Sequence, residues 1–362
     1  MQPLTVGVLG CGTISAAYIE NAVQFDSYNI VACADLDPER TTATADEYGL
    51  TGYEPDELLA TDDVELVVNL TPPAVHAGTC KQILDAGKHV YVEKPLAVSH
   101  DEAVSIRDQA EAAGLRLGGA PDTFLGTGLQ TCRSVIDDGH IGEPVGATAV
   151  WVSGGHESWH ANPDLFYREG GGPLFDMGPY YVTALVSLLG PASRVTGSVS
   201  QTTTERTITS EPRHGETIPV EVPTHETGIV DFERGATATL TTSFDGAGRS
   251  TFPTPAFEIY GTGGTLQLPD PNQFTGRVAI QRDGEETETV EPTHDHAVGR
   301  GLGVADMARA IRNDGDHRAN GRLACHVLEI LSGIRAASES GEHVELDSTL
   351  DRPEPVSPSF VD

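Results

Sequence analysis

Over the first third of the chain, short apolar runs alternate with segments whose apolar residues recur at helical spacing. The apolar runs predict five strands, at residues 4–9, 29–34, 64–70, 89–92 and 115–119. The segments between them predict four helices, near residues 14–23, 38–48, 74–86 and 100–113. Pro38, and the pair Ser99 and Asp101, are typical helix start signals. This alternation predicts an α/β domain with a doubly wound parallel sheet, which we place at residues 1–122.

The pattern changes after residue 122. A helix is predicted at residues 128–138, and stretches rich in threonine and valine predict strands at 146–152, 195–203, 227–230 and 237–243. Turn-forming residues separate these strands, and two further helices are predicted at 304–312 and 321–338. We therefore predict a second, α+β domain at residues 123–362, with a large open mixed or antiparallel sheet. Residues 202–224 are polar enough to predict a long exposed loop.

The charge of the chain indicates its environment. It carries a formal charge of −32, from 54 acidic and 22 basic residues among 362, and the acids are spread over the whole sequence. Lysine occurs only three times: Lys81 and Lys88 are expected on an ordinary polar helix and turn, whereas Lys94 follows a buried strand. Because concentrated salt screens repulsion within such a surface, we predict a halophilic protein, with an acidic mesophilic protein as the alternative. A nucleic-acid partner is disfavoured, since no basic face is visible.

Cysteine use and hydropathy indicate the compartment. The five cysteines are odd in number, widely spaced and form no Cys-x-x-Cys pair. Neither a disulfide framework nor a thiolate zinc site is therefore indicated. No secretory segment precedes the first strand, and no run of 18 apolar residues is present to span a membrane. We expect a soluble cytoplasmic protein without a membrane partner.

The first candidate site is a glycine turn directly after the first predicted strand. It reads Gly10-Cys11-Gly12-Thr13-Ile14-Ser15. Gly10 permits the tight turn, Gly12 lets the backbone approach a pyrophosphate, and N–H groups at Thr13 and Ile14 open a helix whose positive end attracts phosphate. The final serine stands where this dinucleotide-binding fingerprint has glycine or alanine. Asp35, at the end of the second strand, is positioned to bind ribose hydroxyls and to repel a 2′-phosphate, so we predict NAD rather than NADP in a Rossmann domain.

Two loops after later strands extend this candidate cofactor site. After residues 64–70, Thr71-Pro72-Pro73 forms a stiff turn suited to lie against a flat ring such as nicotinamide, and His76 follows on the next helix. After residues 89–92 comes Glu93-Lys94-Pro95. Ligands bind at the carboxyl ends of strands in an α/β sheet, so both loops are expected at the cofactor. The alternatives are a plain strand-to-helix connection for the first loop and a chance surface lysine for the second.

A third candidate site lies about 80 residues beyond Lys94. The glycines at 170–172 precede a predicted helix on which Asp176 and Tyr180 have i, i+4 spacing and so share one face. A carboxylate, a phenol and a lysine that converge on one cleft would form a proton-transfer set, because a nearby ammonium lowers the pKa of a phenol. We predict Lys94, Asp176 and Tyr180 as catalytic residues. In the alternative, Asp176 caps the helix and Tyr180 fills the domain interface.

The segment before the glycine run supplies further substrate-binding candidates. Trp159 offers an aromatic face for a sugar ring, with His160 and Arg168 as polar neighbours, and a folded surface loop is the alternative. His156 with His160, and the run His294-x-His296, could be metal ligands, but no third ligand is evident and the proposed chemistry needs no metal. We predict no metal site and assign these histidines to structure or substrate contact.

In this order and spacing, the motifs resemble the glucose-fructose oxidoreductase, inositol dehydrogenase and rhizopine-catabolism (Gfo/Idh/MocA) family. The segments that carry the resemblance are GCGTIS, Asp35, Thr71-Pro72, Glu93-Lys94-Pro95 and Gly-Gly-Gly-x-x-x-Asp-x-Gly-x-Tyr. The resemblance implies a Rossmann domain, a second domain whose open sheet mediates oligomerisation into a dimer or tetramer, and nicotinamide-dependent oxidation or reduction of a sugar, polyol or derivative. It also implies that Lys94 contacts both nicotinamide and the substrate hydroxyl, and that Asp176 binds substrate.

Many members of that family carry histidine at the position of Tyr180. The tyrosine resembles the branch that includes glucose-fructose oxidoreductase and the xylose or dihydrodiol dehydrogenases, which puts inositol-type Asp/His chemistry in doubt and favours a cyclic sugar or aldose-like substrate. Tyr180, made more acidic by Lys94, would take the hydroxyl proton as the hydride leaves, and Asp176 would hold a neighbouring hydroxyl. An NAD-dependent glycosidase and a non-catalytic nucleotide-binding regulator on the same scaffold are the alternatives.

Overall fold

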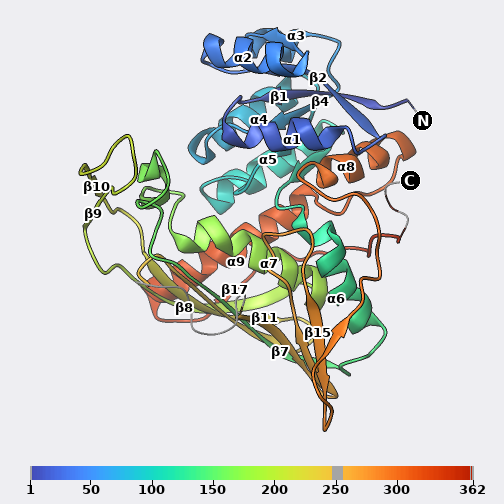
Figure 1. Cartoon of the computed structure of the whole chain (residues 1–362), viewed down its shortest axis with the longest axis vertical. Helices are drawn as coiled ribbons and strands as arrows, with labels where there is room; N and C mark the ends of the chain where they lie inside the picture. The colour runs from blue at the N-terminus through green and yellow to red at the C-terminus, as the bar shows by residue number, and fades with distance from the viewer. Residues whose placement is uncertain (1, 247–255, 359, 361–362) are drawn as a thin grey trace. The chain divides into compact units, whose positions relative to one another are not determined.

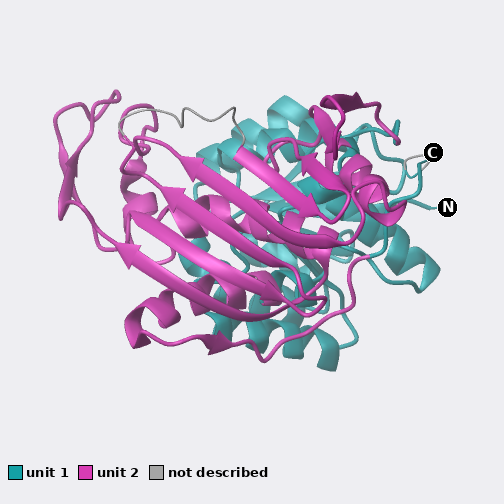
Figure 2. Cartoon of the chain, turned by 90° about the horizontal axis from the view of Figure 1, so that it is seen from below, with its two compact units in different colours: residues 1–127, 294–325, 354–362 teal, residues 128–293, 326–353 magenta. Residues whose placement is uncertain are grey.

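The computed structural model describes residues 2–246, 256–358 and 360. Two compact units make up the chain (Figure 2). Unit 1 comprises residues 1–127, 294–325 and 354–362, and unit 2 comprises residues 128–293 and 326–353. The first division lies near the predicted boundary at residue 122. The last two segments of unit 1 come from the region that the sequence assigned to the second domain.

Unit 1 is built on a six-stranded parallel sheet with the order β3-β2-β1-β4-β5-β6. Its strands are β1 Leu4–Leu9, β2 Tyr28–Ala34, β3 Thr51–Tyr53, β4 Leu66–Asn69, β5 His89–Val92 and β6 Leu117–Gly119. Every residue of β4 is buried, as is typical of a parallel strand covered on both faces. The strand order reverses between β1 and β4, and the carboxyl ends of strands at such a point form the usual ligand site. The predicted doubly wound sheet is confirmed.

Helices accompany these strands, and all but the last of them lie between one strand and the next. They are α1 Thr13–Ala22, α2 Pro38–Tyr48, α3 Pro55–Ala60, α4 His76–Asp85, α5 His100–Ala112 and α8 Leu302–Asn313, with short 3-10 turns at Pro73–Val75 and Thr123–Leu125. The predicted start of α2 is confirmed, since Pro38 opens the helix and the Asp37 carboxylate accepts the N–H of Glu39. The sequence did not predict β3 and α3, because both are short and largely exposed and therefore lack a clear apolar period.

The later segments of unit 1 complete its hydrogen bonds. The buried Asp122 carboxylate accepts the N–H groups of Gly301 and Gly303, at 3.1 and 3.0 Å. Beside β6, the N–H of Gly119 donates to the carbonyl of Ala319 at 3.0 Å. The unit that carries the glycine turn is therefore assembled from both ends of the chain.

One lysine of unit 1 has a different role from the one predicted. Lys88 was expected on an ordinary polar turn, but its side chain is buried and its ammonium donates to the carbonyl oxygens of Thr61 and Val64, at 2.6 and 2.7 Å. Burial lowers the pKa of Lys88. This lysine therefore ties the segment before β4 to the turn before β5, and the prediction of an ordinary surface lysine was wrong.

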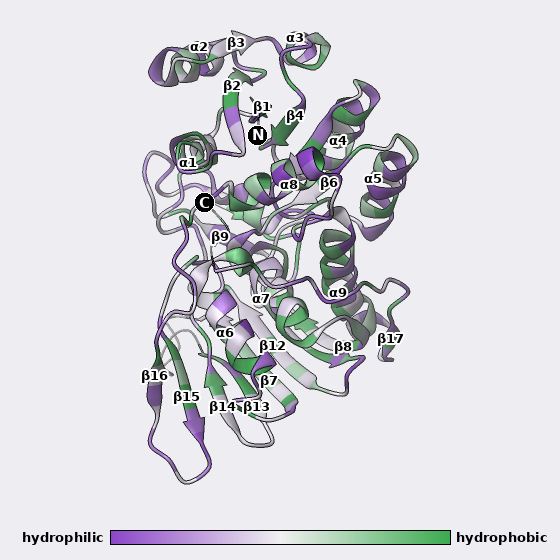
Figure 3. Cartoon of the chain, turned by 90° about the vertical axis from the view of Figure 1, so that its right-hand side faces the viewer, coloured by the Kyte–Doolittle hydropathy of each residue, from purple (hydrophilic) through white to green (hydrophobic). Residues whose placement is uncertain are grey.

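Unit 2 is built on a nine-stranded mixed sheet with the order β16-β15-β14-β13-β7-β12-β11-β8-β17. Its strands are β7 Pro144–Val152, β8 Ala192–Ser200, β11 His225–Phe232, β12 Thr237–Ser243, β13 Ala256–Gly261, β14 Gly264–Gln267, β15 Val278–Arg282, β16 Glu288–Val290 and β17 Val344–Glu345. Only β7 and β12 pair in parallel among these neighbours. Buried and more exposed residues alternate along β11 and β12, and Figure 3 shows hydrophobic and hydrophilic positions alternating along the strands of this sheet. The predicted large mixed sheet is confirmed.

Helices cover one face of that sheet (Figure 1). They are α6 Thr127–Asp137, α7 Pro173–Leu189 and α9 Gly321–Ser340. Ile334 of α9 packs so closely on β8 and β11 that a Cβ at Gly197 or Gly228 would lie 2.2–2.5 Å from it. These two glycines therefore allow the helix to approach the sheet.

The polar segment 202–224 is more ordered than predicted. It contains the antiparallel pair β9 Glu205–Thr207 and β10 Thr217–Pro219. A buried cluster stabilises this pair: Tyr167, Ile208, Ile218, Val220 and Phe244. The prediction of a long exposed loop was therefore wrong, because a few isolated apolar residues in a polar stretch were enough to form a small core.

Candidate functional site

The glycine turn of unit 1 leaves space for a ligand at Gly12. Gly10 is required by the protein itself, because its φ is +105° and a Cβ there would lie 2.8 Å from the carbonyl group of Leu70. A Cβ at Gly12 would meet no protein atom within 4 Å. No side chain caps α1 and no acidic residue lies in its first turn. An open approach to an uncapped helix N-terminus fits a phosphate group.

The serine that departs from the fingerprint is compatible with this turn. Ser15 is buried, and its hydroxyl donates to the carbonyl of Gly12 at 2.7 Å. The Ser15 N–H donates to the same carbonyl at 3.1 Å. The side chain thus fills the place of glycine or alanine while its polar atom remains hydrogen-bonded.

The carboxylate of Asp35 is held in a fixed orientation at the end of β2. One oxygen, Oδ2, accepts the N–H of Cys11 at 2.7 Å, and the other, Oδ1, accepts the N–H of Asp37 at 2.9 Å. The first bond connects Asp35 directly to the glycine turn. The predicted ribose-binding carboxylate therefore lies beside the predicted phosphate-binding turn, and backbone groups orient it.

His76 joins the two loops that follow β4 and β5. Its side chain is 1% exposed, its Nδ1 lies 2.6 Å from the carbonyl oxygen of Pro95, and its Nε2 lies 2.7 Å from that of Thr71. Burial lowers the pKa of His76, while the two carbonyl groups act in the opposite direction. Because backbone groups occupy both ring nitrogens, His76 can contribute to a cofactor site only through the two loops that it connects.

Glu93 ties the lysine loop to the first helix. Its Oε1 accepts the Tyr18 hydroxyl at 3.0 Å, and its Oε2 accepts the Lys94 N–H at 2.9 Å. Burial raises the pKa of Tyr18, so the hydroxyl stays protonated and remains a donor. The sequence did not identify Tyr18, because a tyrosine on the apolar face of an amphipathic helix has the pattern of an ordinary core residue.

In unit 2, the glycine run before α7 is explained by the protein's own packing. A Cβ at Gly171 would lie 2.7–2.8 Å from three carbonyl oxygens of residues 165–168, and Gly172 has a φ of +91°. Glu226 accepts the N–H of Leu174 at 2.9 Å and pairs with Arg335 at 2.6 Å. Arg335 in turn donates to the carbonyl of Gly171 at 2.9 Å. These glycines therefore allow a tight helix start rather than close approach of a ligand.

Asp176 and Tyr180 both lie on α7, and Asp176 has a histidine partner. The Nε2 atom of His156 lies 2.9 Å from Oδ2 of Asp176, and both side chains are about nine-tenths buried. Gly172, not Asp176, is the N-cap residue of α7, so the alternative role of Asp176 as a helix cap is not supported. Tyr180 is also buried. The pairing of His156 with Asp176 was not predicted, because 20 residues separate them and no sequence period connects them.

Aromatic rings surround His156, the hydrogen-bond partner of this carboxylate. The ring centroids of His156 and Trp159 are 5.0 Å apart, and those of Trp159 and His160 are 5.4 Å apart. The Trp159 side chain is 63% exposed. His160 is partly buried, and this burial lowers the pKa of its imidazole. The structure thus brings Trp159 and His160 to the vicinity of Asp176. Arg168 is largely exposed and pairs with Asp164 at 3.7 Å instead.

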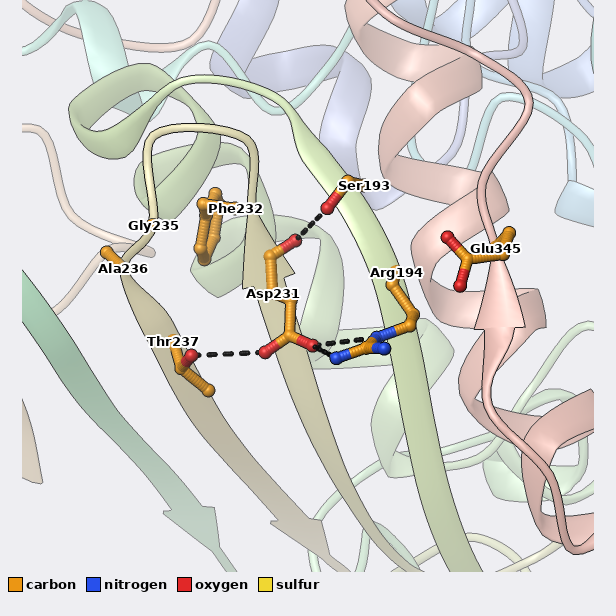
Figure 4. Close-up of a pocket in the computed structure, with 8 residues that line it drawn as sticks. All are labelled: Ser193, Arg194, Asp231, Phe232, Gly235, Ala236, Thr237 and Glu345. Atoms are coloured by element: carbon orange, nitrogen blue, oxygen red, sulfur yellow. Dashed lines mark hydrogen bonds and ion pairs between the residues drawn. The ribbon is translucent and has the colours of Figure 1, made fainter.

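The histidines of the run His294-x-His296 belong to unit 1, and a surface hollow belongs to unit 2. In unit 1, His294 and His296 bond to the carbonyls of Val356 and Leu125, at 2.9 and 3.0 Å. Among the described residues, no group of three or more histidine, cysteine or acidic side chains could hold a metal ion. A hollow on unit 2 is centred on an ion pair between Arg194 and Asp231 at 2.7 Å (Figure 4). None of the predicted site residues lines it.

In the described parts of the chain, no helix is both long and apolar enough to cross a bilayer.

Comparisons with known proteins agree with both units. A model described as "Oxidoreductase family, NAD-binding Rossmann fold" matches residues 4–119, and one described as "GFO/IDH/MocA C-terminal domain" matches residues 129–267. The chain is 30% identical over 352 residues to D-xylose 1-dehydrogenase (NADP(+)) 2 of Haloferax volcanii, which covers 94% of this chain and 99% of the relative. It is 25% identical over 331 residues to levoglucosan dehydrogenase of Pseudarthrobacter phenanthrenivorans, with 83% of each chain covered.

A solved structure confirms the architecture. An NAD binding oxidoreductase from Klebsiella pneumoniae matches with a TM-score of 0.80 and 24% identity, over 95% of this chain and 99% of that one. The matches cover both units in the same order as the motifs described above. The chain therefore belongs to the Gfo/Idh/MocA family of oxidoreductases.

Proposed function

We propose that this oxidoreductase is an NAD-dependent dehydrogenase of a cyclic sugar or aldose-like substrate. The observation that carries the proposal is the group formed by the oriented Asp176 carboxylate, the exposed ring of Trp159 and Tyr180 on the same helix as Asp176. A carboxylate is suited to accept hydrogen bonds from sugar hydroxyls, and an exposed indole is suited to lie against the apolar face of a sugar ring. The relatives named above act on xylose and levoglucosan, which agrees with this substrate class.

In the proposed mechanism, Lys94, Asp176 and Tyr180 act on the substrate. Lys94 lowers the pKa of Tyr180 through its ammonium, so that Tyr180 as a phenolate takes the proton of the substrate hydroxyl and becomes a neutral phenol. Asp176 holds a neighbouring hydroxyl and so orients the substrate. When bound, the nicotinamide cofactor supplies the hydride acceptor. Trp159 and His160 contact the sugar, and Arg168 is a more peripheral candidate because it pairs with Asp164.

The choice of NAD over NADP rests on Asp35. Its two oxygens are held by the N–H groups of Cys11 and Asp37, so the carboxylate cannot turn away from a ligand without losing both bonds. A fixed negative charge at this position favours ribose hydroxyls and repels a 2′-phosphate. Gly10, Gly12, Thr13 and Ile14 would hold the pyrophosphate. The Thr71-Pro72 turn and the loop of Glu93 and Lys94, which His76 connects, would hold the nicotinamide.

The test is reduction of NAD or NADP, followed at 340 nm in molar KCl with a panel of aldoses, polyols, inositols and sugar acids. We expect one sugar to reduce NAD, and we expect Lys94→Ala and Tyr180→Phe to abolish this reaction. Lys81→Ala and Tyr181→Phe are matched controls, because Lys81 lies on α4 and Tyr181 packs on Phe257 of the sheet. Activity in both catalytic variants would refute the assigned roles. Silence with every sugar despite tight NADH binding would instead favour a glycosidase or a regulator.

We also propose that the protein is a homodimer or homotetramer. The face of the unit 2 sheet opposite α7 carries a ladder of threonines, in which the hydroxyls of Thr227 and Thr241 lie 3.2 Å apart and those of Thr239 and Thr148 lie 3.4 Å apart. The apolar Ile229 is exposed beside them. A broad sheet face of this kind is suited to pack on a second copy. Light scattering in molar KCl tests this, and a monomer at micromolar concentration would refute it.

A further inference from the structure

His156 provides Asp176 with a histidine partner that the sequence of α7 does not contain. Tyr180 stands at the position where many family members carry histidine, so Asp176 has no histidine one turn along its own helix. The structure supplies one from the segment between β7 and α7 instead. The Nε2 atom of His156 lies 2.9 Å from Oδ2 of Asp176.

The environment of the ring determines where its proton lies. The Nδ1 atom of His156 is buried and has no hydrogen-bond partner among the described residues. Three aromatic rings surround the imidazole, with centroids at 3.9 Å for Phe166, 4.8 Å for Phe244 and 5.0 Å for Trp159. A proton on Nδ1 would be buried without an acceptor, whereas a proton on Nε2 donates to a carboxylate. The geometry therefore favours the neutral ring with its proton on Nε2.

An ion network fixes the segment that carries His156. Glu157, the next residue, pairs with Arg206 at 2.6 Å, and Arg206 also pairs with Asp245. The carbonyl of Glu157 accepts the N–H groups of Thr209 and Ser210, at 2.8 and 3.1 Å. The side chains in the Arg206 network are 11–14% exposed, so solvent competes little with these contacts. The imidazole is therefore held both by its aromatic neighbours and by its own backbone.

We propose that His156 is the positioning residue of Asp176: as a neutral Nε2–H donor it fixes the orientation of the carboxylate. Because one ring nitrogen bonds to Asp176 and the other lies among aromatic rings, His156 exchanges no proton with the substrate. Proton transfer is left to Tyr180. This inference rests on the proposed function in one respect only, that Asp176 binds the substrate.

A double-mutant cycle tests the positioning role. His156→Phe keeps the aromatic packing and removes the donor, and a charge-assisted hydrogen bond of this kind is worth about a 10- to 100-fold change in kcat/KM. We expect that loss to appear mainly in the KM of the sugar, with NADH affinity unchanged and with partial recovery in His156→Gln, which retains an N–H donor. In an Asp176→Asn background, His156→Phe should change kcat/KM by less than about twofold, because the two residues act as a unit. Full additivity of the two losses would overturn the proposal.

A second measurement does not depend on turnover. ¹⁵N NMR of the full-length protein reports the tautomer of each imidazole, and His156→Gln identifies the resonances of His156. We expect the neutral Nε2-protonated form, with a shift in Asp176→Asn, and an Nδ1-protonated or doubly protonated ring would overturn the proposal. If the expected tautomer is found while no sugar reduces NAD, the proposed function fails and the His156–Asp176 pair stands. Thermal melting of every variant separates loss of folding from loss of positioning.

Discussion

Replacing Asp35 with serine should weaken NADH binding and reverse the preference between the two nicotinamide cofactors. The carboxylate already accepts two backbone N–H groups, at 2.7 and 2.9 Å, and would accept ribose hydroxyls with its remaining lone pairs. A hydrogen bond to a charged group contributes about 1.5–3 kcal/mol, so Asp35→Ser should weaken NADH binding by about 10- to 150-fold. NADPH binding should become tighter, because the repulsion of the 2′-phosphate is removed.

The assay is a fluorescence titration of NADH and of NADPH at low and at molar KCl. Screening at 1 M salt limits interactions between exposed charges to about 3 Å, so the gain in NADPH affinity should be smaller in molar KCl. Asp37→Ser is the matched control, because Asp37 lies two residues away and caps α2 through the N–H of Glu39, a bond that serine retains. The reasoning is refuted if Asp35→Ser leaves NADH affinity within about twofold of the wild type, or if the wild type itself prefers NADPH.

Four further outcomes are expected. The Gly12→Ala variant should fold with a free energy of unfolding within about 1 kcal/mol of the wild type, because its Cβ meets no protein atom. It should nevertheless bind NADH much more weakly, and an unchanged NADH titration would contradict this. Arg335→Ala should lower the free energy of unfolding, measured in urea, by about 3–5 kcal/mol, because the substitution leaves the buried Glu226 carboxylate without its ion-pair partner. A loss below about 1 kcal/mol would count against this prediction. Burial lowers the pKa of His76 and His317 in the folded state, so the unfolded chain binds protons more readily. The stability that these two histidines contribute is therefore fully present above a pH of about 6.5 and should fall as the pH drops below it. Melting temperatures measured at pH 7.5 and 5.5 will show this decrease. With a net charge of −32, the melting temperature should rise between low and molar KCl, and a flat or falling curve would refute the halophilic prediction.

The parts of the fold that follow from periodicity were predictable from the sequence. The strands β1, β2, β4 and β5 of the parallel sheet are largely apolar runs, and β1 and β5 begin and end where the sequence placed them. The glycine turn also follows from local rules, since Gly10 needs a positive φ and Gly12 opens a helix without a side-chain cap. Such features depend on residues close together in the chain.

The features that were missed depend on partners far apart in the sequence. Lys88 has the polar context of a surface residue, but its buried ammonium donates to carbonyl groups of residues more than 20 positions away in the sequence. The glycines before α7 make room for Arg335 and for the backbone of residues 165–168, and the distant Arg335 could not be recognised as their partner from the sequence. The pairing of His156 with Asp176 likewise requires the loop between β7 and α7 to fold back, which the arginine network at Arg206 makes possible.

The composition of unit 1 from three segments constrains how the protein can be made and dissected. A ribosome that has produced residues 1–127 has completed every strand of the parallel sheet, but Asp122 still lacks the N–H groups of Gly301 and Gly303, and β6 lacks Ala319. An expressed fragment that stops at residue 127 therefore lacks both the hydrogen-bond donors of Asp122 and the Gly303 segment that packs against this side chain. The nucleotide-binding half thus matures only after the remainder of the polypeptide has been translated, so deletions near the C-terminus should impair cofactor binding as surely as changes in the glycine turn.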